Sequence, residues 1–301
     1  MALTKKAIRI GQLVDDRKTE KLGEDFMKIA QATVLCTLPY SELSERSVVR
    51  RARLGDGSTL TVTFTACVDG VSLPYGSDRR LMFWLFDRAL EAGSPNIAWE
   101  SAGQYLREMK LFDSGRNYRL LQESFLRLAG MHINIERFGA AGGVIGMNRS
   151  IFDDYHLPKS ISCLADPRQM SLDGIERKPF GVRLSQRLFE DFASNHISLP
   201  RRIWSDMGGS AQVQDIVMWL CYRCHAARNE SLIPWAALAD QFSRDSNPRR
   251  QKAIAVEAVM ILRRLWPSVG LEAVDKGLMV SKATSAMLPD DVGRGRISDL
   301  N

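Results

Sequence analysis

The chain has 301 residues, 45% of them hydrophobic and 25% charged, and its 41 Lys and Arg against 35 Asp and Glu give a net charge of +6. This length favours two domains over one and allows each a sizeable core. No uninterrupted apolar run reaches the about 18 residues of a membrane span, and no signal-peptide-like apolar run follows the N-terminal charges. We therefore expect a cytoplasmic protein with no membrane association, whose five cysteines need no disulfides.

The first ninety residues predict a helix, a strand and a core helix. Residues 17–35 have the spacing of an amphipathic helix that ends at the proline of the Leu-Pro-Tyr segment at 38–40. Residues 44–53 carry four arginines, which form either a solvated face or a contact with phosphate. Residues 60–66 alternate apolar and threonine side chains, as a half-buried strand does. After a turn at 73–76, residues 80–90 are too apolar for a surface helix and predict a buried one.

Residues 99–150 predict two more helices and a hairpin. The first helix follows Ser101 as its N-cap and ends near residue 111, and a turn at 113–115 precedes the second, at 116–129. This second helix places its apolar side chains on one face and a mainly basic set on the other: Arg116, Arg119, Glu123 and Arg127. Residues 132–136 then alternate like a strand, the glycine-rich 138–143 segment forms a tip, and a return strand begins near residue 144.

Helix, helix, turn, basic helix and hairpin is the order of a winged-helix domain. In that design the third helix enters the major groove of DNA and the hairpin contacts the flanking backbone. The glycine run at 139–146 lacks the Gly-Lys-Ser/Thr ending of a P-loop, so it does not indicate a nucleotide site.

The same order recurs in the second half of the chain. Helices are expected at 186–194, 210–227, 234–242 and 249–266, and a hairpin at 269–281 that turns near 275–277. The sequence therefore predicts an α+β fold, mainly helical, made of two tandem winged-helix domains. They occupy residues 1–150 and 181–289, with a loop-rich connection at 151–180 and a flexible tail at 290–301.

The helix at 249–266 is the strongest candidate for DNA contact. Arg249, Arg250 and Lys252 lie in its first turn, where the helix dipole favours acidic side chains. A DNA phosphate would resolve this unfavourable placement. Arg263 lies on the same side of the helix, and Asn247 either caps the helix or reads adenine.

Further candidates come from the first domain and the two hairpins. Arg116, Asn117 and Arg119 would contact bases as the second-domain cations do, and Arg127 shares their helix. Arg137 and Lys276 lie near the hairpins and suit phosphate contacts, which position a protein without reading sequence. A single basic helix is more often a solvated face, but the duplicated arrangement favours DNA binding.

No enzymatic, metal or cofactor site is expected. The four histidines are scattered, and Asp153-Asp154 is a lone acidic pair in a probable loop. Cys221 and Cys224 form a C-x-x-C, which half of a zinc site or a redox pair would share. They also continue the apolar spacing of a helix, which favours core cysteines.

Three ordered stretches resemble the RepA-type plasmid replication initiators. The first is Leu-Pro-Tyr-Gly-Ser-Asp-Arg-Arg-Leu-Met-Phe-Trp-Leu-Phe-Asp-Arg-Ala at 73–89. The second is Val-Arg-Leu-Ser-Gln-Arg-Leu-Phe-Glu-Asp-Phe at 182–192, followed by Ser-Leu-Pro at 198–200. The third combines residues 215–223, 233–242, the basic helix and Lys-Gly-Leu-Met-Val at 276–280. The resemblance spans residues 22–289 and departs from the family at Ser243, where glycine is common, and in the segment 150–177.

The resemblance implies a non-enzymatic protein that binds repeated double-stranded sequences at a plasmid origin, helps to open an adjacent A·T-rich segment and recruits host replication proteins. It implies partners beyond DNA, namely a host initiator, a replicative helicase and a second copy of the chain. A homodimer formed through the N-terminal domain would exchange with a monomer. The alternative is a winged-helix transcriptional repressor that binds an operator and does not support replication of a minimal origin plasmid.

Overall fold

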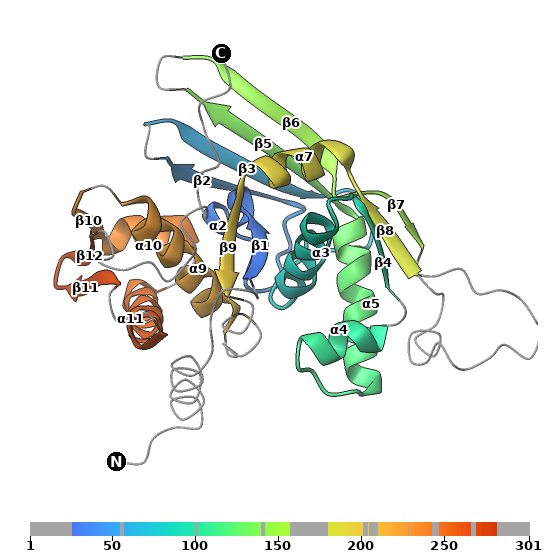
Figure 1. Ribbon diagram of the computed structural model, residues 1–301. Helices are drawn as coiled ribbons and strands as arrows, with labels where there is room; N and C mark the ends of the chain where they lie inside the picture. The colour runs from blue at the N-terminus through green and yellow to red at the C-terminus, as the bar shows by residue number, and fades with distance from the viewer. Residues whose placement is uncertain are drawn as a thin grey trace, which may run out of the picture.

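A computed structural model describes residues 26–54, 57–99, 102–139, 142–156, 180–200, 204, 210–227, 229–242, 247–265 and 269–281. The fold is α+β, as the sequence predicted, and falls into an N-terminal part, residues 26–200, and a C-terminal part, residues 210–281 (Figure 1). Parts of the helix expected at 17–35 and of the connection expected at 151–180 lie outside the described residues, as do the whole tail at 290–301 and Ser101.

The N-terminal part is organised around a four-stranded antiparallel sheet. Its strands are β2 (Ser47–Arg53), β3 (Thr59–Ala66), β5 (Met131–Phe138) and β6 (Val144–Ser150), in the order β2-β3-β5-β6. The alternation seen in the sequence explains β3, since Leu60, Val62 and Phe64 are fully buried while Thr63 and Thr65 stay half-buried. The helices α3 (Asp78–Ala92) and α5 (Gly115–Ala129) lie below this sheet in Figure 1, and α4 (Ala102–Glu108) lies between them in the chain.

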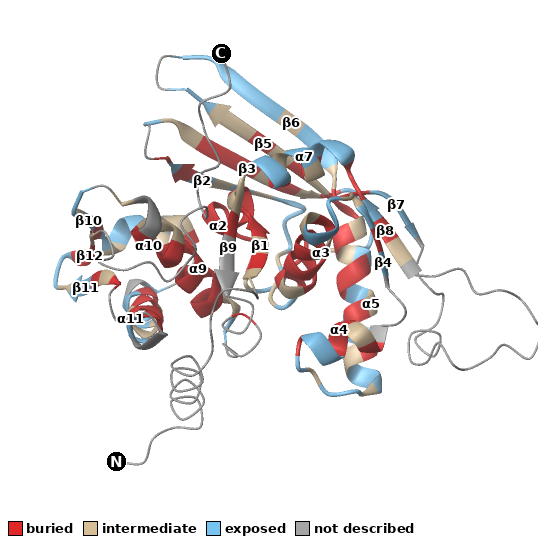
Figure 2. Ribbon diagram, viewed as in Figure 1, coloured by how far each residue is buried: buried red, intermediate tan, exposed pale blue. Residues whose placement is uncertain are grey.

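Helix α3 is the core helix that its composition predicted. Seven consecutive residues, 81–87, are buried, so solvent reaches neither face of its middle turns (Figure 2). Helix α5 is amphipathic as predicted, and its buried face carries Tyr118, Leu121, Phe125 and Leu128. The turn before α3 includes Gly76 at a φ of +53°, a left-handed backbone conformation that favours glycine.

Two smaller sheets complete the N-terminal part. β4 (Asn96–Trp99), β8 (Phe180–Leu184) and β7 (Phe152–His156) pair in the order β4-β8-β7, and β1 (Phe26–Ala30) pairs with β9 (His196–Pro200). α2 (Gln31–Leu35) follows β1, and α7 (Gln186–Ser194) lies between β8 and β9 and packs Phe192 on Phe86 of α3, with ring centroids 4.5 Å apart. Residues 180–200 therefore pack with the N-terminal part.

These pairings correct three expectations. Residues 26–30 form a strand where a helix was predicted, because antiparallel pairing with β9 satisfies their backbone and their burial alternates. Residues 152–156, expected to open the loop-rich connection, form β7, and residues 180–200 form β8, α7 and β9, which pair or pack with elements of the N-terminal part. The β5–β6 hairpin, expected as the wing of the first domain, is part of the four-stranded sheet, because β5 pairs with β3 along its whole length.

The C-terminal part repeats helix, strand, helix, helix and hairpin. Its elements are α9 (Ala211–Ala226), β10 (Ser231–Pro234), α10 (Trp235–Phe242), α11 (Pro248–Leu265), β11 (Gly270–Val274) and β12 (Gly277–Ser281). The strands form a sheet in the order β10-β12-β11, so the strand after the first helix joins the hairpin. Gly277 permits this pairing, because an added Cβ would lie 2.2 Å from the Ile233 carbonyl oxygen.

Candidate nucleic-acid interface

The N-terminus of α11 is fixed by a side-chain cap. Asn247 Oδ1 accepts a hydrogen bond from the Arg249 backbone N–H at 2.9 Å, and the Asn247 carbonyl accepts one from the Gln251 N–H at 3.0 Å. Of the two roles that the sequence left open for Asn247, the structure thus shows the capping role. The first turn contains no acidic residue, so the arginines there face the positive end of the helix dipole without local compensation.

α11 separates a buried face from an exposed basic one. Gln251, Ala255, Ala258, Val259 and Leu262 are buried, and side-chain burial at Leu265, expected to continue the core stripe, lies outside the described residues. The predicted contacts at both ends of the helix are exposed: Arg249, Arg250, Lys252 and Arg263. Between these ends Met260 is 52% exposed and Ala253 is also exposed, with the half-buried Glu257 between them. Cations at the ends and small or flexible apolar side chains in the middle suit phosphates and thymine methyl groups respectively.

Two contacts hold α11 against its neighbours. Gln212 of α9 donates from Nε2 to Gln251 Oε1 at 2.6 Å, and both side chains are buried. On the other side, the Lys252 ammonium lies 5.3 Å from the centroid of the Trp235 ring. The rotation of α11 about its axis is thereby defined by one buried polar pair and one stacked cation.

Trp235 also ties the hairpin to the helices. Its indole N–H donates to the Asp275 carbonyl at 3.0 Å, in the two-residue turn between β11 and β12. Lys276 is exposed in that same turn. One tryptophan therefore links α10, the basic helix and the hairpin turn that carries Lys276. Sequence reasoning did not identify Trp235, although a tryptophan at the start of a short helix was a visible signal.

In α5 the predicted cations take different environments. Arg116 and Arg119 are exposed near the N-terminus of the helix. Ser114 caps that end by accepting the Asn117 backbone N–H, and Asn117 Nδ2 donates to the Phe112 carbonyl at 2.7 Å. The Asn117 amide thus stabilises the preceding turn, which leaves the two arginines as the solvent-facing polar groups of the first turns.

Arg127 lies in the interior. Its Nε and Nη2 bond to the two carboxylate oxygens of Asp78 at 2.6 and 2.9 Å, and the side chains are 14% and 1% exposed. Its guanidinium lies 4.9 Å from the Tyr75 ring centroid, and Ser124 Oγ also donates to Asp78 at 2.6 Å. A helical wheel put Arg127 on the polar face, but the first turn of α3 packs against that position. Arg127 therefore fastens α5 to α3.

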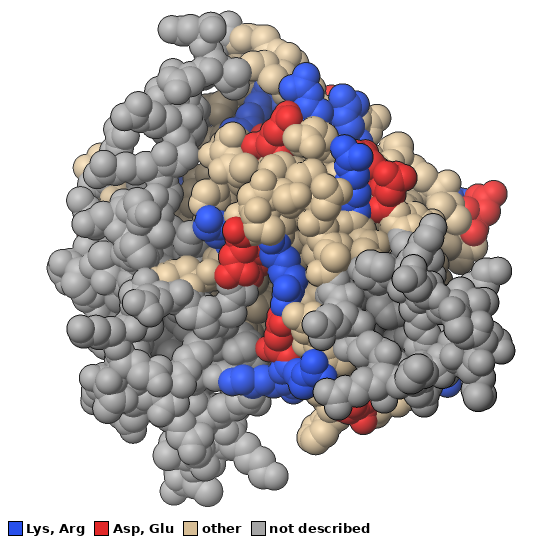
Figure 3. All heavy atoms as spheres, turned by 45° about the vertical axis from the view of Figure 1, so that its right-hand side comes forward, with Lys and Arg blue, Asp and Glu red and all other residues tan. Residues whose placement is uncertain are grey.

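Arg137 and the arginine-rich segment at 44–53 are also partly engaged by the protein. Arg137 Nη2 lies 3.9 Å from Asp191 Oδ1, and burial raises the pKa of that carboxyl while Arg137 lowers it. Arg46 bonds to Asp69 and to the Ala66 carbonyl, and Arg50 donates to the Thr37 carbonyl. On the face drawn in Figure 3, Lys and Arg side chains stand beside Asp and Glu, so exposed charge there is mixed.

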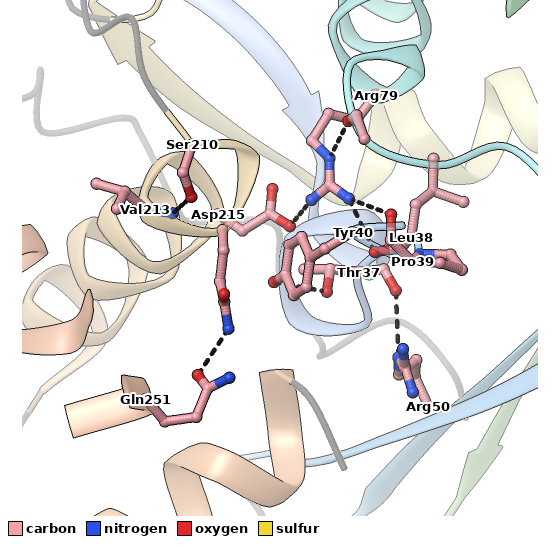
Figure 4. Close-up of polar contacts among 12 residues, drawn as sticks. Thr37, Leu38, Pro39, Tyr40, Arg50, Arg79, Ser210, Val213, Asp215 and Gln251 are labelled. Atoms are coloured by element: carbon pink, nitrogen blue, oxygen red, sulfur yellow. Dashed lines mark hydrogen bonds and ion pairs between the residues drawn. The ribbon is translucent and has the colours of Figure 1, made fainter. Parts of the chain in front are cut away.

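The two parts meet at a buried ion pair, Arg79 of α3 with Asp215 of α9 (Figure 4). Both side chains are 1% exposed. Arg79 also donates to three carbonyls, those of Leu38 at 2.9 Å, Pro39 at 2.8 Å and Gly76 at 2.9 Å, and lies 4.6 Å from the Tyr40 ring centroid. Burial raises the pKa of Asp215 from 3.8 to about 6, against the lowering effect of Arg79.

The consecutive residues Asp78 and Arg79 thus connect the two basic helices. Asp78 holds α5 through Arg127, and Arg79 holds α9 through Asp215. α9 in turn holds α11 through the Gln212–Gln251 pair. The Asp-Arg pair sits in the first motif that carries the sequence resemblance, yet its partners, 49 and 136 residues away along the chain, could not be identified from sequence.

The cysteines of the C-x-x-C are core residues, as predicted. Cys221 and Cys224 are buried in α9, and burial raises the pKa of the Cys224 thiol to about 12. Within the described ranges, no three His, Cys, Asp or Glu side chains gather as a metal site requires. None of the helices described here combines the length and apolar character needed to cross a membrane.

The comparison with solved structures identifies a similar fold. A crystal structure of domains 2 and 3 of RctB matches with a TM-score of 0.50 and 11% sequence identity, covering 85% of this chain and 97% of that chain. A second crystal structure of RctB domains 2 and 3 has a TM-score of 0.45 at 11% identity and covers 82% and 94% of the two chains. No protein-family model matches the chain, and no curated protein sequence does. At this identity the similarity establishes the fold.

Proposed function

We propose that this chain is a replication initiator that binds origin DNA through a winged-helix domain formed by residues 210–281, with α11 as the recognition helix. The observation that carries the proposal is the exposed basic face of α11 beside the β11–β12 hairpin, both oriented by Trp235. The helix-strand-helix-helix-hairpin order with strand order β10-β12-β11 is that of winged-helix domains.

The sequence resemblance to RepA-type initiators favours initiation over other uses of DNA binding, and the fold is similar to that of domains 2 and 3 of RctB. The sequence resemblance to RepA-type proteins adds the finer assignment: a plasmid origin with repeated sites, opening of an adjacent A·T-rich segment, recruitment of a host initiator and helicase, and a homodimer in exchange with the monomer. The protein would act by binding alone, without catalysis, metal or cofactor.

The chemistry of each exposed side chain indicates which part of the DNA it would contact. Arg249 and Arg250 reach base edges, and an arginine that pairs bidentately with guanine contributes about 1–3 kcal/mol of discrimination. Lys252, Arg263 and Lys276 neutralise phosphates and set the register of the helix in the groove. Ala253 and Met260 present apolar surface to thymine methyl groups.

The test compares binding of the full chain to its own origin duplex and to a scrambled duplex at several salt concentrations. Arg249→Ala with Arg250→Ala should reduce origin affinity by about 100-fold or more and remove the preference for origin over scrambled duplex, while the salt slope, which the phosphate contacts set, changes little. The matched control is Arg183→Ala with Arg187→Ala, which removes the same charge from exposed positions in β8 and α7.

Equal losses in the two double variants would overturn the role of α11. Replication of a minimal origin plasmid then separates the initiator from a repressor. If the protein is a repressor, it binds its site through α11 and the double variant loses that binding. The wild-type repressor would nevertheless fail to maintain the plasmid, whereas a wild-type initiator maintains it.

A further inference from the structure

The turn between α4 and α5 presents an aromatic side chain to solvent. Phe112 is 88% exposed, the highest exposure of any large hydrophobic residue in the described part of the chain. The turn itself is well ordered by hydrogen bonds, because Asn117 Nδ2 donates to the Phe112 carbonyl at 2.7 Å and Ser114 caps α5. An ordered backbone therefore keeps the Phe112 ring in solvent. In this position the ring does not contribute the stabilisation that its burial would provide.

The same turn contains an unfavourable backbone choice. Lys110 has a φ of +52° and is the one non-glycine residue with positive φ among those the structure describes. Its N–H bonds to the Arg107 carbonyl at 3.0 Å, and that of Leu111 to the Leu106 carbonyl at 2.8 Å. This pair of bonds terminates a helix with a left-handed residue that is usually glycine. A lysine there introduces strain, and strain of this kind concentrates at functional positions.

The charges around Phe112 indicate what would cover it. Four exposed cations lie in the end of α4, the turn and the first turns of α5: Arg107, Lys110, Arg116 and Arg119. The carboxylate of Glu108 is engaged by Trp84 Nε1 and by Arg88, which leaves Asp113 as the acidic side chain of the turn. An exposed aromatic ring on a segment that carries four exposed cations matches nucleic acid, whose bases can stack on the ring while phosphates meet the cations.

We propose, on the basis of the proposed DNA-binding function, that the α4–α5 turn is a second nucleic-acid site in which Phe112 stacks on an unstacked DNA base. In the view of Figure 1 the turn and α11 both lie on the lower side of the molecule, away from the four-stranded sheet. The base comes either from a single strand or from a kinked step of duplex, and Phe112 serves as a stacking platform in the first case and as a wedge in the second.

Two variants and one control test the site on the full chain. Phe112→Ala removes the ring, Phe112→Trp keeps an aromatic face, and Tyr155→Ala removes another exposed aromatic side chain, 55% exposed in β7. The probes are a fluorescein-labelled 20-nucleotide oligo(dT) and the origin duplex, followed by anisotropy. Phe112→Ala should lower the affinity of the protein for one of the two probes by about tenfold. Phe112→Trp and Tyr155→Ala should bind both probes as the wild type does.

The two arms identify the source of the base. If Phe112→Ala loses affinity for oligo(dT) alone, the ring stacks on a base of a single strand. If it loses affinity for the duplex and bends the bound duplex less, the ring stacks at a kinked step. Unchanged affinity of Phe112→Ala for both probes overturns the proposal.

Lys110→Gly provides an independent readout. It should raise the melting temperature by relieving the left-handed strain and should lower the salt slope on the affected probe by about 1. A stabilised variant with an unchanged slope contradicts a role for Lys110. Failure of the proposed function is a separate result, namely equal binding of wild-type protein to origin and scrambled duplexes, which leaves the oligo(dT) comparison interpretable.

Discussion

The two parts of the molecule use the same order of elements and pair their strands differently. In the C-terminal part the strand after the first helix, β10, pairs with the second strand of the hairpin, β12. In the N-terminal part the corresponding strand, β4, pairs with β8, and the hairpin strand β5 pairs with β3. The order of elements along a chain therefore leaves the strand partners open, and distant segments such as β3 and β8 decide them.

The basic helices of the two parts differ in the same way. α11 exposes the cations at both of its ends, whereas α5 exposes Arg116 and Arg119 and uses Arg127 to bind the buried Asp78. The β11–β12 hairpin adjoins its helix through Trp235, while the β5–β6 hairpin belongs to a larger sheet. The comparison is consistent with our proposal that the C-terminal part reads DNA, and it gives the cations of the N-terminal part a larger structural share.

The largest expected effect separates the two helices directly. Arg249→Ala with Arg250→Ala should lower origin affinity by about 100-fold or more and remove sequence preference, because base contacts are lost. Arg116→Ala with Arg119→Ala should weaken origin and scrambled duplexes equally, by a smaller factor, because our proposal for the α4–α5 turn gives these arginines phosphate contacts in place of the base contacts expected from sequence, and phosphate contacts carry no sequence information. Anisotropy titrations measure both, and a selective loss of origin binding in the α5 variant would break the distinction.

Breaking the ion pair between the parts should cost the most stability. Arg79→Met leaves Asp215 buried without its counterion and three carbonyls without their donor, and removal of one partner of a buried pair typically costs about 3–5 kcal/mol. Chemical denaturation measures the free energy of unfolding. A loss below about 1 kcal/mol would mean that the junction at Arg79 does not hold the parts together.

Acidification acts on the same pair with a definite sign. The pKa of Asp215 is raised from 3.8 to about 6, so the folded state binds this proton at a higher pH than the unfolded chain does. The contribution of Asp215 to the free energy of unfolding therefore rises as the pH falls through this interval and is lost as the pH rises. Chemical denaturation of the wild type and of Asp215→Asn at pH 4.5 and 7 measures this. The free energy of unfolding of the wild type should increase relative to that of the variant at the lower pH. An identical difference at both values contradicts the shift.

A matched pair of arginines sharpens the contrast between α5 and α11. Arg127→Met should lower the free energy of unfolding by about 2–3 kcal/mol, because it leaves the Asp78 carboxylate buried without two charge-assisted hydrogen bonds. Arg263→Met, at an exposed position late in α11, should leave stability unchanged and weaken DNA binding. The reverse pattern, with Arg127→Met stable and defective in binding, would return Arg127 to the DNA interface.

The smallest expected effect concerns the hairpin tip. Trp235→Phe keeps the ring beneath Lys252 and removes the hydrogen bond to the Asp275 carbonyl, at a cost of about 0.5–1 kcal/mol. Amide hydrogen exchange should accelerate in β11 and β12 and stay unchanged in β5 and β6, which the larger sheet holds. Equal exchange in the variant and the wild type would show that Trp235 does not restrain the hairpin.

The sequence by itself determined the local elements. Alternation in β3, the apolar run of α3, the amphipathic period of α5 and the Asn-Pro start of α11 each depend on neighbours within a few residues, and each appears where it was predicted. The cysteines at 221 and 224 followed the same local logic.

Only the tertiary structure decided which strands pair and which charged side chains are engaged by the protein instead of facing solvent. Residues 26–30 are a strand because β9, 166 to 174 residues later, pairs with them, and Arg127 is internal because Asp78 lies against it. Both outcomes depend on contacts between distant segments, which periodicity cannot encode because it reports only the side of an element that faces the core. The same limit explains why Trp235 and the Arg79–Asp215 pair were found in the structure: their importance lies in what they touch, and only folding brings those partners together.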